Sequence, residues 1–364
     1  MSTGIILLNF GEPEDPTPEA VVAYLERIFR TNMSLEGNLP PERVRARVRQ
    51  LAEERAPGLI EELESIGGSP LNRQALAQAD VLEAELARRG HDVRCYVAYQ
   101  FAEPLIADVV RRAREDGVTR VIGFPVYPLA GPSTTVAALD DLRRTVDEAR
   151  WDVELREVGG WHRHPAFTAM WADAARRTAD AAGIDLRDPR VRLVFSVHGT
   201  PMKYIEAGSR YVEYAEEACA AVAEALGVAM YEIGYQNHTN RPVAWTQPDI
   251  EAVIERVDAD HVVVVPIAFM REQSETLAEL DHELREEAES RGLGFHRVPV
   301  PHDDPRLGGL LADVVAPLLE GPADRVGVGA ADAAGDEARG GAPGVAACEC
   351  RPGACCMAGA VPVG

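Results

Sequence analysis

Short apolar runs of strand length alternate with longer segments of helical period along most of the chain, and this alternation constrains the fold more than any other feature. Helical patterns, for example at 71–89, 104–116, 206–226 and 274–290, separate the apolar runs. Strands that alternate with helices in this way form parallel sheets, so the sequence predicts an α/β fold. The predicted strands are 4–10, 92–99, 119–127, 152–158, 191–197, 229–235, 261–269 and 294–300.

The predicted strands divide into two groups of four, and in each group the first strand is followed by a similar Gly-x-Pro turn. The strand GIILLNF runs into residues 11–13 (GEP), and VRLVFSV runs through His198 into residues 199–201 (GTP). We therefore expect two Rossmann-like domains, each a four-stranded parallel sheet flanked by helices. The expected bounds are 1–160 and 161–302, with a helix at 303–319 that packs back on the first domain.

The end of the chain differs in composition from the rest. Residues 321–364 are dominated by Gly, Ala, Asp and Pro, which predicts a flexible tail. Four of the six cysteines lie there, and such crowding in a cytoplasmic protein favours metal or cluster binding over disulfides. They are Cys348, Cys350, Cys355 and Cys356. Cys95 and Cys219 fall in a predicted strand and a predicted helix, where small core residues are expected.

Net charge and hydropathy indicate which classes of partner the protein can bind. The 37 Lys and Arg against 59 Asp and Glu give a net charge of −22, which repels phosphate backbones and argues against nucleic acid. No apolar run approaches the roughly 18 residues of a membrane span, and the start lacks signal-peptide features, so we expect a cytoplasmic protein. Residues 21–33 (VVAYLERIFRTNM) are expected to form a core-facing helix, with peripheral membrane contact as the alternative.

Ligands of open parallel sheets bind beyond the carboxyl ends of the strands, so chemistry is expected after residues 10, 127, 197 and 269. His198 lies at one of these ends, in SVHGTPM. There a neutral imidazole can bind a metal or accept a proton near neutral pH, and the alternative is a histidine that only hydrogen-bonds its own loop. The first strand is not followed by G-x-G-x-x-G, so no nucleotide is expected.

Three glutamates after the seventh predicted strand form a second candidate site. Glu275, Glu279 and Glu283 are spaced i, i+4, i+8, which places them along one face of a helix. Such a row is also typical of a solvated acidic face. Glu275 stands in the first turn after a strand end, however, and a carboxylate facing an imidazole across a cleft suits Fe²⁺ or a proton-accepting pair.

Six segments in order resemble the ferrochelatase family, whose members insert Fe²⁺ into a porphyrin in haem synthesis. The segments cover about residues 4 to 319. They are IGGSPLNRQALAQADVLEAEL (66–86), FPVYPLAGPSTT (124–135), WHRHPAF (161–167), SVHGTPM (196–202), YQNHTNRPVAWTQP (235–248) and PIAFMREQSETLAELD (266–281). One departure is Glu272-Gln273, where the family often has Asp-His.

The resemblance implies a lyase that takes Fe²⁺ as substrate and releases two protons from the porphyrin. It implies that His198 is the active-site histidine, that Glu275 is the acid facing it, and that Glu279 and Glu283 form an acidic track behind, all four as metal-contacting residues. Which of His198 and Glu275 delivers iron and which accepts protons stays open. So does the choice between protoporphyrin IX and coproporphyrin III, and the oligomeric state.

The same resemblance implies substrate contacts and a cluster. The substrate-binding residues are Phe10, Tyr127, Ser133, Thr134 and Trp245, although Phe10 is equally well read as ordinary core. Many family members carry a [2Fe–2S] cluster, for which the four tail cysteines supply enough thiolates. Adjacent cysteines are awkward ligands, so Cys95 or Cys219 could substitute. The alternatives to a ferrochelatase are a cobalt or nickel chelatase of a related tetrapyrrole and a non-catalytic porphyrin- or haem-binding protein.

Overall fold

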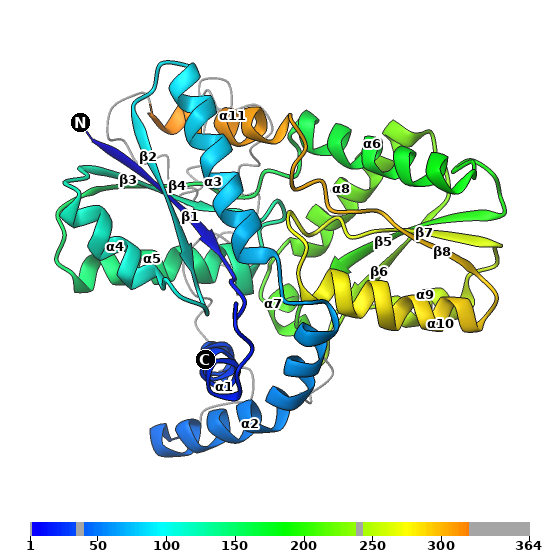
Figure 1. Cartoon of the computed structure of the whole chain (residues 1–364), viewed down its shortest axis with the longest axis horizontal. Coiled ribbons are helices and arrows are strands. Elements are labelled where there is room, and N and C mark those ends of the chain that lie inside the picture. The colour runs from blue at the N-terminus through cyan, green and yellow to red at the C-terminus, as the bar shows by residue number, and fades with distance from the viewer. Residues whose placement is uncertain (1, 34–39, 238–242, 320–364) are drawn as a thin grey trace.

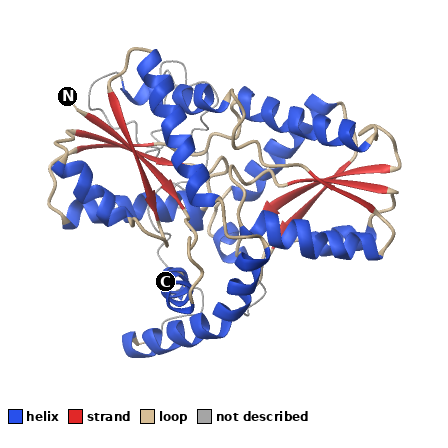
Figure 2. Cartoon of the chain, in the orientation of Figure 1, coloured by secondary structure: helices blue, strands red, loops and turns tan. Residues whose placement is uncertain are grey.

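The computed structural model describes residues 2–33, 40–237 and 243–319, and it contains two four-stranded parallel sheets with helices on both faces (Figures 1 and 2). The predicted fold class is confirmed for this part of the chain, whereas the predicted tail and its four cysteines lie outside the described residues. The first sheet holds β1 (Thr3–Asn9), β2 (Val93–Tyr99), β3 (Arg120–Pro125) and β4 (Glu154–Glu157). The second holds β5 (Val191–His198), β6 (Tyr231–Gln236), β7 (His261–Val265) and β8 (Gly294–Arg297).

The two sheets have the same strand order. It is β2-β1-β3-β4 in the first and β6-β5-β7-β8 in the second, and every pairing is parallel. In each sheet the chain first adds a strand on one side of the starting strand and then crosses to the other side. The carboxyl ends of β1 and β3, and of β5 and β7, therefore lie at the points where the strand order reverses, which is where ligands of such sheets bind.

The helices cover the sheets in the expected order. They are α1 (Pro18–Thr31), α2 (Pro41–Ser65), α3 (Leu71–Arg88), α4 (Ile106–Glu115), η2 (Pro132–Val136), α5 (Ala137–Glu148), α6 (Pro165–Ala182), α7 (Met202–Glu206), α8 (Tyr211–Leu226), α9 (Ile250–Arg256), η3 (Glu275–Leu284), α10 (Arg285–Ser290) and α11 (Leu307–Leu319). Figure 1 shows α3 and α11 on one face of the first sheet and α4 and α5 on the other. In the second sheet α6 and α8 lie opposite α9 and α10.

Several predicted elements differ in their bounds, and three of these differences have a clear consequence or cause. The helix predicted at 206–226 is divided into α7 and α8, because Gly208 takes a φ of 102° that no helix continues through. The strand predicted at 261–269 ends at Val265, since Pro266 has no N–H to donate to the ladder. The helix predicted at 274–290 begins as the π-helix η3 and continues as α10.

Helices α1 and α2 form a hairpin that projects from the first domain at the bottom of Figure 1. Its apolar side chains, including Tyr24, Phe29, Leu51 and Leu63, are buried in a small core of their own. The apolar residues of 21–33 that offered a membrane contact are thus mostly turned toward α2. Among the described helices, none has both the length and the apolar character needed to cross a bilayer.

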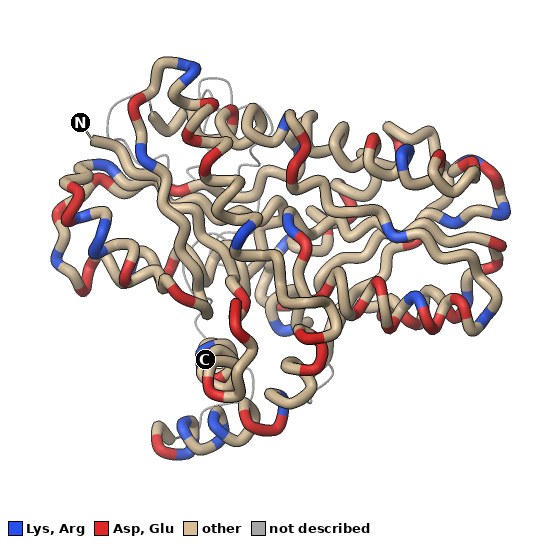
Figure 3. Tube along the Cα trace, in the orientation of Figure 1, with Lys and Arg blue, Asp and Glu red and all other residues tan. Residues whose placement is uncertain are grey.

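The helix α11 follows the second sheet but packs on the first domain, against α3. Arg89 pairs with Asp313 at 2.6 Å, and Arg120 donates to the carbonyl of Leu319 at 2.8 Å. Acidic residues are spread over both domains and the hairpin, with Arg and Lys interspersed among them (Figure 3).

Candidate active site

A cavity lies where the carboxyl ends of both sheets meet the α1–α2 hairpin. Its empty volume is about 1600 Å³, a figure that includes open solvent at the mouth. Residues that follow β1, β3, β5 and β7 all reach it, as the strand-order argument requires. The predicted site residues that line it are Phe10, Tyr127, Ser133, Thr134, His198, Trp245, Glu275 and Glu279.

His198 and Glu275 face each other inside the cavity. His198 is the last residue of β5 and Glu275 is the first of η3, and the distance from Nε2 to Oε1 is 3.7 Å. This is too long for a hydrogen bond. Two ligand atoms that each lie about 2.1 Å from one cation are at most about 4.2 Å apart, so the gap suits a shared metal ion.

The backbone fixes the tautomer of His198. Its Nδ1 lies 2.6 Å from the carbonyl oxygen of Gly199. Because a carbonyl oxygen can only accept, Nδ1 carries the proton and Nε2 presents its lone pair toward Glu275. His198 thus forms the loop hydrogen bond of the alternative interpretation. The same bond orients Nε2, the nitrogen that faces the cavity.

Burial shifts both groups toward their neutral forms. It lowers the pKa of His198, which keeps the imidazole unprotonated near neutral pH. Burial also raises the pKa of Glu275 to about 8, and the charges of Glu12 and Glu62 add to this rise. A neutral imidazole and a carboxyl that titrates near physiological pH can bind a cation or take up a proton, which is the behaviour expected of a functional site.

Gln236 was not singled out from the sequence, yet it organises the acidic helix. It ends β6 and is the register partner of His198 on the neighbouring strand. Its amide accepts from the hydroxyl of Ser196 at 2.6 Å and donates at 2.9 Å to the carboxylate of Glu279 and to the backbone carbonyl of Glu275. It belongs to the YQN segment, but no spacing rule links that segment to a helix that begins about forty residues later.

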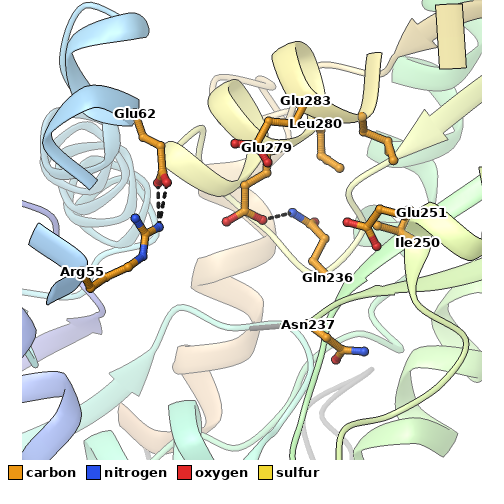
Figure 4. A pocket seen from close by; sticks show the side chains of 10 residues that line it. Arg55, Glu62, Gln236, Asn237, Ile250, Glu251, Glu279, Leu280 and Glu283 are labelled. Atoms are coloured by element: carbon orange, nitrogen blue, oxygen red, sulfur yellow. Dashed lines mark hydrogen bonds and ion pairs between the residues drawn. The ribbon is translucent and has the colours of Figure 1, made fainter. Parts of the chain in front are cut away.

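Glu283, which was expected on the acidic track behind Glu275, does not line this cavity. It lies in an adjoining pocket of about 720 Å³ with Glu62 and Glu251, and only Glu279 and Glu62 among these acids line both spaces (Figure 4). The i, i+4, i+8 row thus leads from the inner cavity outward. Within the described ranges, no group of three or more His, Cys, Asp or Glu side chains is arranged to hold a metal ion.

The wall opposite the second domain is aromatic and apolar. Phe10 packs edge-on against Phe101, with ring centroids 4.6 Å apart, and against Tyr24 at 6.3 Å. Phe10 is thus both part of the hairpin core and part of the cavity wall. Sequence reasoning missed the contribution of α1, whose lining residues are Tyr24, Leu25, Ile28 and Phe29, although the apolar pattern at 21–33 is their signal.

The two described cysteines lie in different domains. Cys219 is fully buried in the apolar core beneath α8, whereas Cys95 lies on β2 in the other domain. Burial raises the pKa of both thiols. Whether either substitutes for a tail cysteine stays a prediction, because the tail lies outside the described residues.

Comparison with known proteins yields one family. The ferrochelatase family model matches residues 2–318. A ferrochelatase from Synechococcus sp. (strain JA-3-3Ab) is 36% identical over 329 residues, which are 87% of this chain and 94% of that protein. The coproporphyrin III ferrochelatase of Mycolicibacterium smegmatis is 31% identical over 328 residues, covering 87% of this chain and 90% of the relative.

Among solved structures, SirB from Bacillus subtilis with Fe³⁺ superposes with a TM-score of 0.50 at 11% identity, over 87% of this chain and 95% of SirB. At that identity the likeness concerns the fold alone. The family match spans both sheets, the cavity between them and α11. The chain therefore belongs to the ferrochelatase family.

Proposed function

We propose that this protein inserts Fe²⁺ into a porphyrin, with release of two protons, as the metal-inserting lyase of haem biosynthesis. The observation that carries the proposal is the His198–Glu275 pair, 3.7 Å apart in a large cavity with an aromatic wall. A flat macrocycle can stack on such a wall. The family match over residues 2–318 supports the same activity.

The proposed roles of the residues follow from their positions in the cavity. Two pyrrole N–H protons must leave as the metal enters, so an acceptor near the ring centre lowers the barrier. His198 presents a lone pair there, and Glu275 accepts a proton or binds the cation in its ionised form. Glu279 lies between the two pockets, where it can receive a cation from Glu283 or pass a released proton outward to it. Phe10, Tyr127, Ser133, Thr134 and Trp245 are proposed to hold the porphyrin.

The test is iron insertion by purified variants. His198→Ala and Glu275→Ala should each lower kcat by at least about a hundredfold, which is the scale of a lost general base. Glu289→Ala is the matched control, because Glu289 is an exposed glutamate near the end of the same acidic segment. Normal turnover by both folded active-site variants would sink the assignment.

Competing functions give different readouts in the same assay. Offering Fe²⁺, Co²⁺ and Ni²⁺ separates a ferrochelatase from a cobalt or nickel chelatase. Porphyrin binding without a change to the metalloporphyrin spectrum would indicate a carrier. Running protoporphyrin IX beside coproporphyrin III identifies the substrate, and the similarity to a coproporphyrin III ferrochelatase makes the comparison worthwhile.

The remaining parts of the proposal rest on sequence. We propose a cytoplasmic location, with any membrane contact peripheral, and domain bounds near residues 160 and 302. We also propose that Cys348, Cys350, Cys355 and Cys356 hold a [2Fe–2S] cluster, on the ground that four thiols fall within nine residues. Bound iron and sulfide that disappear in a four-Cys→Ser variant would support the cluster, and a colourless wild-type protein without bound iron would refute it.

A further inference from the structure

A carboxyl group from the first domain reaches the segment that carries Glu275. Glu12 lies in the turn after β1, where Gly11 takes a φ of 82° and an added Cβ would come within 2.7 Å of Tyr99 and Ala102. Only glycine suits that turn. The turn directs the chain so that the side chain of Glu12 points toward the second domain and lines the cavity.

The side chain of one residue, Asn72, forms hydrogen bonds with both the backbone N–H and the backbone carbonyl of Glu12. Asn72, near the start of α3, accepts from the N–H of Glu12 at 3.2 Å and donates to its carbonyl at 2.8 Å. The hydroxyl of Tyr99 in turn donates to the carbonyl of Asn72 at 3.2 Å. The position of Glu12 is therefore fixed by the first domain, independently of any contact that its side chain makes.

The carboxyl group of Glu12 forms hydrogen bonds with the side chain of Ser69 in its own domain and with Ser274 across the domain boundary. The hydroxyl of Ser274 donates to Oε1 at 2.5 Å and its backbone N–H donates to Oε2 at 3.4 Å. Ser274 immediately precedes Glu275 and the π-helix η3. Glu12 is 5% exposed and Ser274 is 7% exposed, so water competes little for these bonds.

We propose that Glu12 is a positioning residue for metal insertion, which acts by clamping Ser274 and thereby fixing the first turn of η3, and with it the carboxylate of Glu275, opposite His198. This inference rests on the proposed function. A carboxylate held about half an ångström out of place changes rates strongly in preorganised sites. The clamp also ties the two walls of the cavity together at the reacting centre rather than at its rim.

A double-mutant cycle tests the clamp. Glu12→Ala and Ser274→Ala should each lower kcat about tenfold, with the KM for porphyrin changed by less than about twofold, because the first change removes both hydrogen bonds from Ser274 and the second removes the bond from its hydroxyl. The double variant should be no slower than the slower single variant, since both remove the same contact. Glu12→Gln should recover most of kcat, because its amide oxygen still accepts from the hydroxyl of Ser274. Glu14→Ala, an exposed glutamate in the same loop, is the matched control.

Each outcome is decisive. Wild-type kcat in Glu12→Ala, independent effects that multiply in the double variant, or a change confined to KM would overturn the clamp while leaving the proposed function intact. Failure of the wild-type protein to insert any metal would instead remove the proposed function. The clamp is then tested by thermal unfolding of the wild type, Glu12→Ala, Ser274→Ala and the double variant. Coupling between the two changes in unfolding free energy supports the clamp, and simple additivity refutes it. If Glu12→Ala does not fold, a tenfold lower kcat in Ser274→Ala beside a nearly normal kcat in Glu12→Gln supports the clamp, and a normal kcat in Ser274→Ala refutes it.

Discussion

The side-chain amide of Gln236 donates a hydrogen bond of 2.9 Å to the carboxylate of Glu279. The same nitrogen also bonds the backbone carbonyl of Glu275, so one residue at the end of β6 holds the first turn of η3 at two points. Because His198 is the register partner of Gln236, the sheet itself sets the distance between the imidazole and the acidic helix. The active-site geometry therefore depends on ordinary strand pairing as well as on the residues that do chemistry.

Replacing Gln236 by Leu should lower both activity and stability. The change leaves the hydroxyl of Ser196 and the carbonyl of Glu275 without this partner in a buried setting, which costs about 1–3 kcal/mol of unfolding free energy. We expect kcat to fall at least tenfold, measured beside chemical denaturation. Gln50→Leu, on the exposed face of α2, should leave kcat and the unfolding free energy nearly unchanged. Equal behaviour of the two variants would contradict the role of Gln236.

Replacing Glu275 by Gln should stabilise the protein at alkaline pH. The pKa of Glu275 is about 8 in the folded protein and about 4.3 when unfolded, so between these values the folded state binds more protons. Stability contributed by the protonated form is present below pH 4 and falls as pH rises toward 8. The variant lacks this loss and should gain on the order of 2 kcal/mol near pH 8, as measured by urea unfolding across the pH range. A gain that is equally large at pH 4 would contradict this origin.

Removing the charge of Glu62 should shift the pH dependence of the reaction. Glu62 lies on α2 and its charge raises the pKa of Glu275, of Glu279 and of Glu283. In Glu62→Gln these carboxyls lose their protons at lower pH, so the acid limb of kcat/KM should move to lower pH. The neighbouring Glu61→Gln is exposed and should leave the limb in place. An acid limb that stays in place or moves to higher pH in Glu62→Gln would contradict this effect of the Glu62 charge.

Sequence reasoning predicted the sheets well because strands buried on both faces are rich in apolar residues: all seven residues of β1 are buried, and residues 5–8 are apolar. It placed His198 and Glu275 in one site because strand ends at a reversal of strand order converge. It did not predict that η3 is a π-helix, since its apolar residues fit a helical period of either kind. Nor could it pair Glu12 with Ser274, because a contact across 262 residues leaves no local pattern.

Glu283 should affect the supply of metal rather than the insertion step. It lies in the outer pocket with Glu251 and Glu62 and does not line the inner cavity. Glu283→Gln should therefore raise the KM for Fe²⁺ several-fold, while kcat and the KM for porphyrin change by less than about twofold. Steady-state kinetics with each substrate varied in turn separates these effects, and Glu289→Gln is the control. A fall in kcat alone would place Glu283 in the chemical step.

Comparing Gly11→Ala with Gly67→Ala should separate the cost of steric overlap from the cost of backbone strain in the unfolding free energy. Gly11 and Gly67 both take positive φ, 82° and 72°, but an added Cβ meets Tyr99 and Ala102 at 2.7 Å only at Gly11 and has no neighbour within 4 Å at Gly67. Gly67→Ala should cost about 1 kcal/mol of unfolding free energy, which is the price of the left-handed backbone alone. Gly11→Ala should cost about 3 kcal/mol or more, since buried atoms must also move. It should also lower kcat by displacing Glu12, whereas Gly67→Ala should not. Equal losses of stability in the two variants would mean that the packing around Gly11 relaxes freely, and the turn would then not be what fixes Glu12 in the cavity.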